Sequence, residues 1–296
     1  MCWQTTRDLN KFLMAADGYL RSQGAEGILL LTAARGCRGE QPLFGWWAVA
    51  QAPDDVRGAF VHDPPSPLVI VGRVPEIAAG IAAVLYRGRA ISGVDASMEA
   101  ADAFAAAWGH RTGLAARLHR HTKVYRMGPS LPDPEGPTGG TRVATIADRA
   151  LLVDWVRAFG TETGDFSPAP EKLADDLISY GGAIFWEADG VAVALATLTR
   201  PVENAVRISM VYTPHSVRHQ GYSGAVTVAA SRAALANPAV REVLLISDRT
   251  SPVRRASDLG YELAGERVLL TFGAPTGPMP RLTGPLVRLG SRVGHG

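Results

Sequence analysis

The strongest chemical signal in the chain lies at residues 211–225, which read VYTPHSVRHQGYSGA. An apolar, β-branched run stops at Pro214, a polar turn with Arg218 follows, and Gly221 and Gly224 open a long alanine-rich segment. A strand, an Arg-led turn and a glycine-started helix in this order suit two kinds of site. One is a phosphate cradle at a helix N-terminus. The other is the nucleophile elbow of a hydrolase, because GYSGA nearly matches G-x-S-x-G.

The spacing disfavours the nucleophile elbow. An elbow needs the strand to run directly into the turn that carries the serine, but residues 214–220 separate the expected strand from Gly221. A hydrolase also needs an acid and then a histidine further along the chain. Asp248 and Asp258 supply acids, yet the one histidine downstream is His295, beside the C-terminus.

The phosphate cradle fits the same residues better. The first N–H groups of a helix have no partner within the helix, and together with the helix dipole they bind anions. Small residues let the backbone approach phosphate oxygens closely, which explains Gly221, Ser223 and Gly224. Arg218 adds positive charge at the turn. The alternative left open is that the glycines only relieve crowding where a helix crosses a sheet.

Two other residue pairs attract attention but predict no second site. His119 and His121 alternate along an expected strand and therefore share one face, as a metal pair would. No third ligand is evident in the sequence, so we expect two solvated histidines and no metal. Of the neighbouring Trp46 and Trp47, one is expected in the core and the other at the surface or a domain interface.

Composition describes a globular protein without a dominant charge. The chain has 296 residues, an apolar fraction of 47%, a charged fraction of 20% and a net charge of +2, which exclude a disordered chain and a strongly basic nucleic-acid or membrane binder. Its 27 arginines against 3 lysines indicate a GC-rich, bacterial genome. Cys2 and Cys37 make no disulfide framework. With neither a leader nor a long apolar span, we expect a cytoplasmic protein.

The chain divides at residues 127–141, MGPSLPDPEGPTGGT, where four prolines and four glycines indicate a linker. This division predicts an N-terminal domain over residues 1–126, a C-terminal domain over 142–273 and an irregular tail over 274–296.

Hydrophobic periodicity predicts a similar order of elements in the two domains. In the first, helices are expected at Thr5–Arg21, Glu76–Tyr86 and Ser97–His110, short apolar strand-like runs at 27–33, 42–50, 58–62 and 67–72, and a final strand at 117–127. In the second, helices are expected at Ala150–Phe159, Glu171–Tyr180 and Gly221–Ala236, a hairpin at 181–200 that turns at Asp189-Gly190, and strands at 142–146, 206–213, 241–247 and 261–272. The order indicates two related α+β units.

The segment R-x-x-G-Y-S at residues 218–223 resembles motif A of the GNAT superfamily of acyl-CoA-dependent N-acyltransferases, whose pattern is [R/Q]-x-x-G-x-[G/A]. RISMVYTP before it, the helix after it, LLISD and LGYELAGE resemble the neighbouring elements of that family in order, so the resemblance covers Arg142–Phe272. It implies a GNAT fold, an α+β sheet that is mostly antiparallel and flanked by helices. The whole chain is similar to tandem, mycothiol-synthase-type enzymes with a degenerate N-terminal unit.

The resemblance implies where acetyl-CoA would bind. The backbone of Val211, Tyr212 and Thr213 would pair with the pantetheine arm, and an N–H near Val211 would stabilise the oxyanion. The turn and the first helical residues would hold the pyrophosphate, which assigns Arg218, His219, Gln220, Gly221, Tyr222, Ser223 and Gly224 to cofactor binding.

The sequence departs from the family pattern at three positions. His219 replaces a glycine of the usual turn, and Ser223 occupies the Gly/Ala position. Ala256 stands where these enzymes commonly carry the tyrosine that protonates the coenzyme A thiolate. Tyr212, Ser257, Asp258 or water would have to supply that proton.

The acceptor amine must be neutral to attack, so a nearby carboxylate is expected to take its proton. Glu162 and Asp165, in the expected acceptor-side loop FGTETGDFSP, are the candidates, with Trp186 and Glu187 beside it. The alternative is a solvated acidic loop.

The function predicted on this basis is transfer of an acetyl group from acetyl-CoA to an amine of a small molecule, by direct attack in a ternary complex. No metal and no membrane partner are expected. The alternatives are a tailoring enzyme that takes its acyl group from a carrier protein or an aminoacyl-tRNA, the one nucleic acid considered, and a non-catalytic acyl-CoA-binding protein.

Overall fold

The computed structural model describes residues 2–37, 39–49, 52–72, 74–85, 89–127, 136–163, 167, 169–247 and 256–273. Its N-terminal half runs β1 (Cys2–Thr6), α1 (Leu9–Ser22), α2 (Ala25–Gly36), β2 (Leu43–Val49), β3 (Ala52–His62), β4 (Leu68–Val71), α3 (Pro75–Leu85), β5 (Gly93–Ala96), α4 (Met98–Thr112) and β6 (Ala115–Met127).

The C-terminal half repeats this order, with a short 3-10 turn in place of the fourth helix. It runs β7 (Gly140–Val143), η1 (Ile146–Asp148), α5 (Arg149–Thr163), α6 (Pro170–Ser179), β8 (Ala183–Ala188), β9 (Val191–Leu198), β10 (Ala205–Tyr212), η2 (His215–Val217), α7 (Tyr222–Leu235), β11 (Glu242–Ser247), η3 (Ala256–Leu259) and β12 (Glu262–Gly273). The predicted α+β class and the two related units are therefore confirmed.

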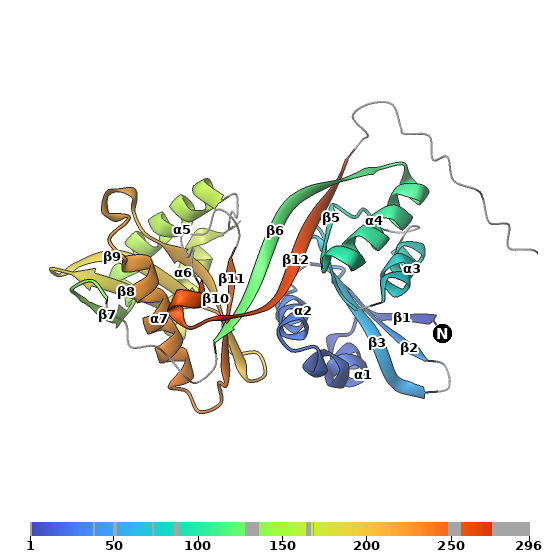
Figure 1. Ribbon diagram of the computed structural model, residues 1–296, viewed down its shortest axis with the longest axis horizontal. Helices are drawn as coiled ribbons and strands as arrows, with labels where there is room; N and C mark the ends of the chain where they lie inside the picture. The colour runs from blue at the N-terminus through green and yellow to red at the C-terminus, as the bar shows by residue number, and fades with distance from the viewer. Residues whose placement is uncertain are drawn as a thin grey trace, which may run out of the picture.

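All described strands join one mostly antiparallel sheet, in the order β1-β2-β3-β4-β5-β12-β6-β11-β10-β9-β8-β7. The last strand of each half completes the sheet of the other half. β6 pairs with β11, β12 pairs with β5, and the two long strands pair with each other between the halves (Figure 1). We keep the domain division at residues 127–141 as a proposal, because residues 128–135 lie outside the described residues, as does the predicted tail over 274–296.

Helices cover both faces of the sheet in each half. Along β10, Met210 and Tyr212 pack in a cluster with α5 and α6, whereas Ile208 and Val211 pack in a cluster with α7. Successive side chains of a strand point to opposite faces, apart from a bulge between Ile208 and Met210. The helix α7 therefore lies on the face opposite to α5 and α6.

Two sequence predictions at the N-terminus were wrong. The apolar run at residues 27–33, expected as a strand, lies in α2, where Leu30 and Leu31 are fully buried. Short apolar runs do not distinguish a strand from a buried helix. The helix expected from Thr5 begins at Leu9, because the Asp8 carboxylate accepts from the N–H groups of Asn10 and Lys11 and caps it. The strand β1, which was not predicted, precedes it.

The β9–β10 turn of the C-terminal half reaches into the N-terminal half. Val202 packs in the core that α1 and α2 form with β2 and β3. The Glu203 carboxylate accepts from Arg21 at 2.6 Å and from Arg35 at 2.8 Å. The exchanged strands are thus reinforced by a second connection between the halves. Within the described part of the chain, no helix is long and apolar enough to cross a membrane.

Candidate functional site

The parallel strands β10 and β11 stop pairing before they end. Their register runs from Ala205–Glu242 to Ile208–Leu245. Beyond that pair, β10 continues to Tyr212 and pairs with β9 alone, while β11 continues to Ser247 along β6. Within the described residues, β10 therefore presents an unpaired edge over residues 209–212 on the side of β11. Such an edge can accept an extended group as an additional strand.

The unpaired edge of β10 leads through a turn to the N-terminus of α7. Among the described residues no side chain caps this helix, and its first turn carries no acidic residue. Gly221, the N-cap residue, has φ 85°, and the nearest described atom to a Cβ placed there would be Pro137 Cδ at 3.7 Å. Glycine is therefore required by backbone conformation rather than by lack of space. The uncapped N–H groups leave α7 suited to bind an anion.

His219 also has a left-handed backbone, with φ 66°. A residue with a Cβ loses free energy in this conformation, and glycine does not. The backbone conformation at this position therefore favours glycine, and His219 adopts the left-handed conformation although it carries a Cβ.

Arg218 is occupied by contacts within the protein. Its Nε donates to the carbonyl oxygen of Thr213 at 2.8 Å, and its Nη1 lies 3.2 Å from Nε2 of His215. Its Nη2 donates to Glu162 Oε2 at 2.5 Å. The guanidinium therefore closes the turn between β10 and α7 and ties it to the last turn of α5. Two predicted site residues, Arg218 and Glu162, are brought together, and each is the other's ion-pair partner.

Tyr212 lies beside this ion pair at the end of β10. Its ring is buried and packs 5.5 Å from the ring of Trp155, measured between centroids. Burial and the Glu162 carboxylate raise the pKa of Tyr212, while Arg218 opposes the rise. Tyr212 therefore keeps its proton at neutral pH, which a proton donor requires.

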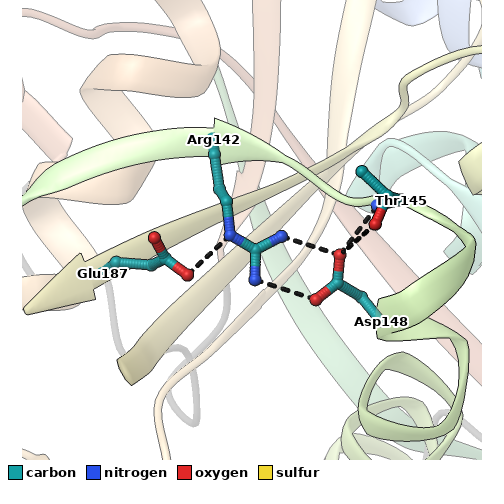
Figure 2. A network of polar contacts seen from close by, with 4 residues as sticks. All are labelled: Arg142, Thr145, Asp148 and Glu187. Atoms are coloured by element: carbon teal, nitrogen blue, oxygen red, sulfur yellow. Dashed lines mark hydrogen bonds and ion pairs between the residues drawn. The ribbon is translucent and has the colours of Figure 1, made fainter. Parts of the chain in front are cut away.

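Of the two remaining acceptor-side candidates, Asp165 and Glu187, the structure describes one. Asp165 lies outside the described residues. Glu187 accepts from Arg142 Nε at 2.5 Å, and the other guanidinium nitrogens of Arg142 donate to Asp148, at 2.7 and 2.8 Å (Figure 2). Asp148 also accepts from the N–H and hydroxyl of Thr145, and mainly the Arg142 hydrogen bonds lower its pKa to about 2. This network attaches η1 to β7 and β8, so Glu187 has a structural partner.

Ala256 is buried in the α7 cluster and offers no proton. The nearby phenol of Tyr261 is bonded to the Ser231 hydroxyl at 2.6 Å, and burial raises its pKa. Tyr261 is thus part of the core beneath α7. Ser257 and Asp258 are exposed on η3.

His119 and His121 are both exposed on β6. His121 Nε2 lies 2.9 Å from Glu266 Oε2 on β12. Among the described residues, no group of three or more potential metal ligands is present.

The equivalent place in the N-terminal half is built differently. The parallel strands β4 and β5 have Val69 and Asp95 as their last pair. There the guanidinium of Arg267, from β12, bridges the strands, because Nη2 donates to the carbonyl oxygens of Ile70 at 3.3 Å and Asp95 at 2.7 Å. Nε also donates to the Asp95 carboxylate at 2.7 Å. Sequence reasoning missed Arg267, since it reaches this place only through the strand exchange.

No protein-family model and no curated protein matches the chain. Among solved structures, a GNAT-family acetyltransferase from Colwellia psychrerythraea is similar with a TM-score of 0.60 and 12% identity, covering 92% of this chain and 99% of that one. A GCN5-related N-acetyltransferase from Sphaerobacter thermophilus has a TM-score of 0.57 and 16% identity, covering 90% and 94%. One from Kribbella flavida has a TM-score of 0.52 and 18% identity, covering 87% and 96%. The chain therefore has the fold of the GCN5-related N-acetyltransferases, and the expected fold is confirmed.

Proposed function

We propose that the protein is an N-acyltransferase that moves an acetyl group from acetyl-CoA to an amine of a small molecule or metabolite. The observation that carries the proposal is the continuity of the unpaired edge of β10 with the uncapped N-terminus of α7. The edge suits the amide-containing pantetheine arm, and the helix N-terminus suits the diphosphate. The shared fold supports the same assignment, as an analogy.

In the proposed ternary complex, the amine nitrogen forms a bond to the thioester carbon, and the C–S bond then breaks. A backbone N–H of β10 near Val211 stabilises the oxyanion, an effect worth about 3 kcal/mol in other enzymes. Glu162, directly or through water, takes the proton that the amine loses. Tyr212 or water gives a proton to the departing thiolate, since Ala256 has none.

Within the turn, Arg218 acts mainly by holding the backbone in place. Two of its contacts join Thr213 and His215 within the turn, and the third ties the turn to α5 through Glu162, which holds the backbone from His219 to Gly224 in place. Preorganised backbone donors need no rearrangement when the anion binds.

Isothermal titration of the protein with acetyl-CoA tests this function, with desulfo-coenzyme A as a non-reactive ligand. Binding in the micromolar range is expected to be lost in Gly221→Trp, which puts a bulky side chain in the cradle. Gly18→Trp is the matched control, because Gly18 is exposed on α1 in the other half and a Cβ there would meet no described atom within 4 Å. Absence of binding at millimolar coenzyme A would refute the proposal and direct the search to donors carried by a protein or a tRNA.

A further inference from the structure

The Thr213 hydroxyl is buried and has no hydrogen-bond partner among the described residues. The residue is 6% exposed, and its Oγ1 makes no hydrogen bond with any described residue. The other buried serine and threonine hydroxyls of the described chain are satisfied. Thr227 bonds the carbonyl oxygen of Ser223 at 2.7 Å, Ser231 bonds that of Thr227 at 2.8 Å, and Thr197 bonds Ser209 at 2.8 Å.

Thr213 stands at the base of the proposed cradle. It directly follows Tyr212, the last residue of β10, whose side chain faces α5 and α6. A residue before a proline is extended, so we expect the Thr213 side chain on the opposite face, the side of α7. Its carbonyl oxygen accepts from Arg218, which folds the turn back over it, and Gly221, the N-cap of α7, stands three residues after Arg218. The hydroxyl and the uncapped helix N-terminus therefore belong to the same small region.

A buried hydroxyl without a partner lowers stability, and valine has the same shape without that cost. A ligand that supplies the missing acceptor would remove the cost when it binds. Phosphate oxygens are strong acceptors, and the uncapped N-terminus of α7 in the same region suits an anion.

We infer that the Thr213 hydroxyl is a binding group for the acyl donor and donates a hydrogen bond to an oxygen of its diphosphate. This inference rests on the proposed function. It adds a side-chain contact to a site otherwise made of backbone groups, and it makes Thr213 a positioning residue rather than a catalytic one.

Thr213→Val and Thr213→Ser test the inference, with titration of coenzyme A and of ADP, which carries the diphosphate without pantetheine. In Thr213→Val, the Kd of both ligands should rise about tenfold, as expected for a lost hydrogen bond to a charged group. The melting temperature of the ligand-free variant should stay or rise, because an unsatisfied hydroxyl is gone. Thr213→Ser keeps the hydroxyl and should stay within about twofold of wild type for both ligands.

The outcomes separate this inference from the proposed function. If wild type binds coenzyme A and Thr213→Val binds it equally well, the hydroxyl is not a ligand and the inference is wrong. A weaker affinity for coenzyme A with unchanged affinity for ADP would place the contact on pantetheine and overturn the diphosphate assignment. If wild type does not bind coenzyme A, both fail together. A lower melting temperature in Thr213→Val would show a structural role instead.

Discussion

Arg218 donates a hydrogen bond from Nη2 to Glu162 Oε2 over 2.5 Å, and this contact joins the two sides of the proposed active site. Arg218 belongs to the turn that would hold the cofactor, whereas Glu162 belongs to the helix that would border the acceptor. Both side chains are partly exposed, at 27% and 33%. Glu162 therefore partly neutralises the positive charge that Arg218 would offer to the cofactor. Arg218 in turn partly neutralises the negative charge that Glu162 would offer to the acceptor amine.

Glu162→Gln should separate the two roles. Removing the carboxylate leaves the positive charge of Arg218 uncompensated at the turn between β10 and α7, so the Kd of acetyl-CoA should fall about threefold, in the range of a partly exposed ion pair. The value of kcat should fall at least about tenfold, because glutamine cannot take the proton of the amine. Titration and steady-state kinetics measure the two effects. Glu171→Gln, at an exposed ion pair with Arg157, should change neither, and an unchanged kcat in Glu162→Gln would exclude Glu162 as the base.

The chain should bind one acyl-CoA rather than two. In the N-terminal half, Arg267 bridges the strands where the C-terminal half leaves β10 unpaired. The connection from β4 to α3 is only residues 72–74, and Glu76 lies in the first turn of α3, where it opposes anion binding. Calorimetric stoichiometry near one is expected, and Gly221→Trp should remove the whole signal. A stoichiometry of two, or half of the heat left in Gly221→Trp, would contradict this reading of Arg267.

The turn between β10 and α7 was accessible to prediction because its signal is local. The Pro214, Arg218 and Gly221 spacing indicated a strand, a turn and a helix, and the structure places β10 and α7 there. Asp189 and Gly190 similarly predicted the β8–β9 turn, where both have positive φ.

The contacts that build the site were not accessible, because they join residues far apart in the sequence. Arg218 and Glu162 are 56 positions apart. Arg267 and Asp95 are 172 positions apart, and they meet only because β12 pairs in the opposite half. Hydrophobic periodicity reports which residues are buried, but not which half of the sheet accepts the last strand.

His62 should make the protein sensitive to mild acid. The residue is 1% exposed, and burial together with the charge of Arg89 lowers its pKa to about 4, below an ordinary value of 6.5. Because the folded state favours neutral His62, its stabilising contribution is complete above pH 6.5 and is lost as the pH falls toward 4, about 3 kcal/mol at most. Urea unfolding of wild type between pH 7 and 4 should show this loss, and His62→Gln should flatten it. The control His119→Gln, at an exposed histidine, should show the same dependence of the free energy of unfolding on pH as wild type. If the free energy of unfolding of His62→Gln fell as steeply with pH as that of wild type, His62 would not be the source of the acid sensitivity.

Glu203 should contribute to the stability of the connection between the halves. Its carboxylate is 14% exposed and bonds Arg21 and Arg35 at the same time. Glu203→Gln keeps the shape but removes the charge, so we expect a loss of about 1–2 kcal/mol in the free energy of unfolding. Glu262→Gln, in the exposed pair with Arg126 at 3.8 Å, should cost less than about 0.5 kcal/mol. Equal effects of the two variants in urea unfolding would show that Glu203 acts as an ordinary surface charge.

His219→Gly should stabilise the turn between β10 and α7, although replacement by glycine usually destabilises a protein. With φ 66°, His219 occupies the left-handed conformation that disfavours a Cβ, so relief of this strain should exceed the greater flexibility of glycine in the unfolded state. The net gain should be about 0.5–1 kcal/mol in the free energy of unfolding. Gln220→Gly is the matched control, because Gln220 is not among the residues with positive φ, and it should lose a similar amount. If His219→Gly and Gln220→Gly changed the free energy of unfolding in the same direction, backbone conformation would not decide the stability of this turn. A turn closer to its bound shape should also bind acetyl-CoA more tightly in His219→Gly, which titration with the same ligand measures directly.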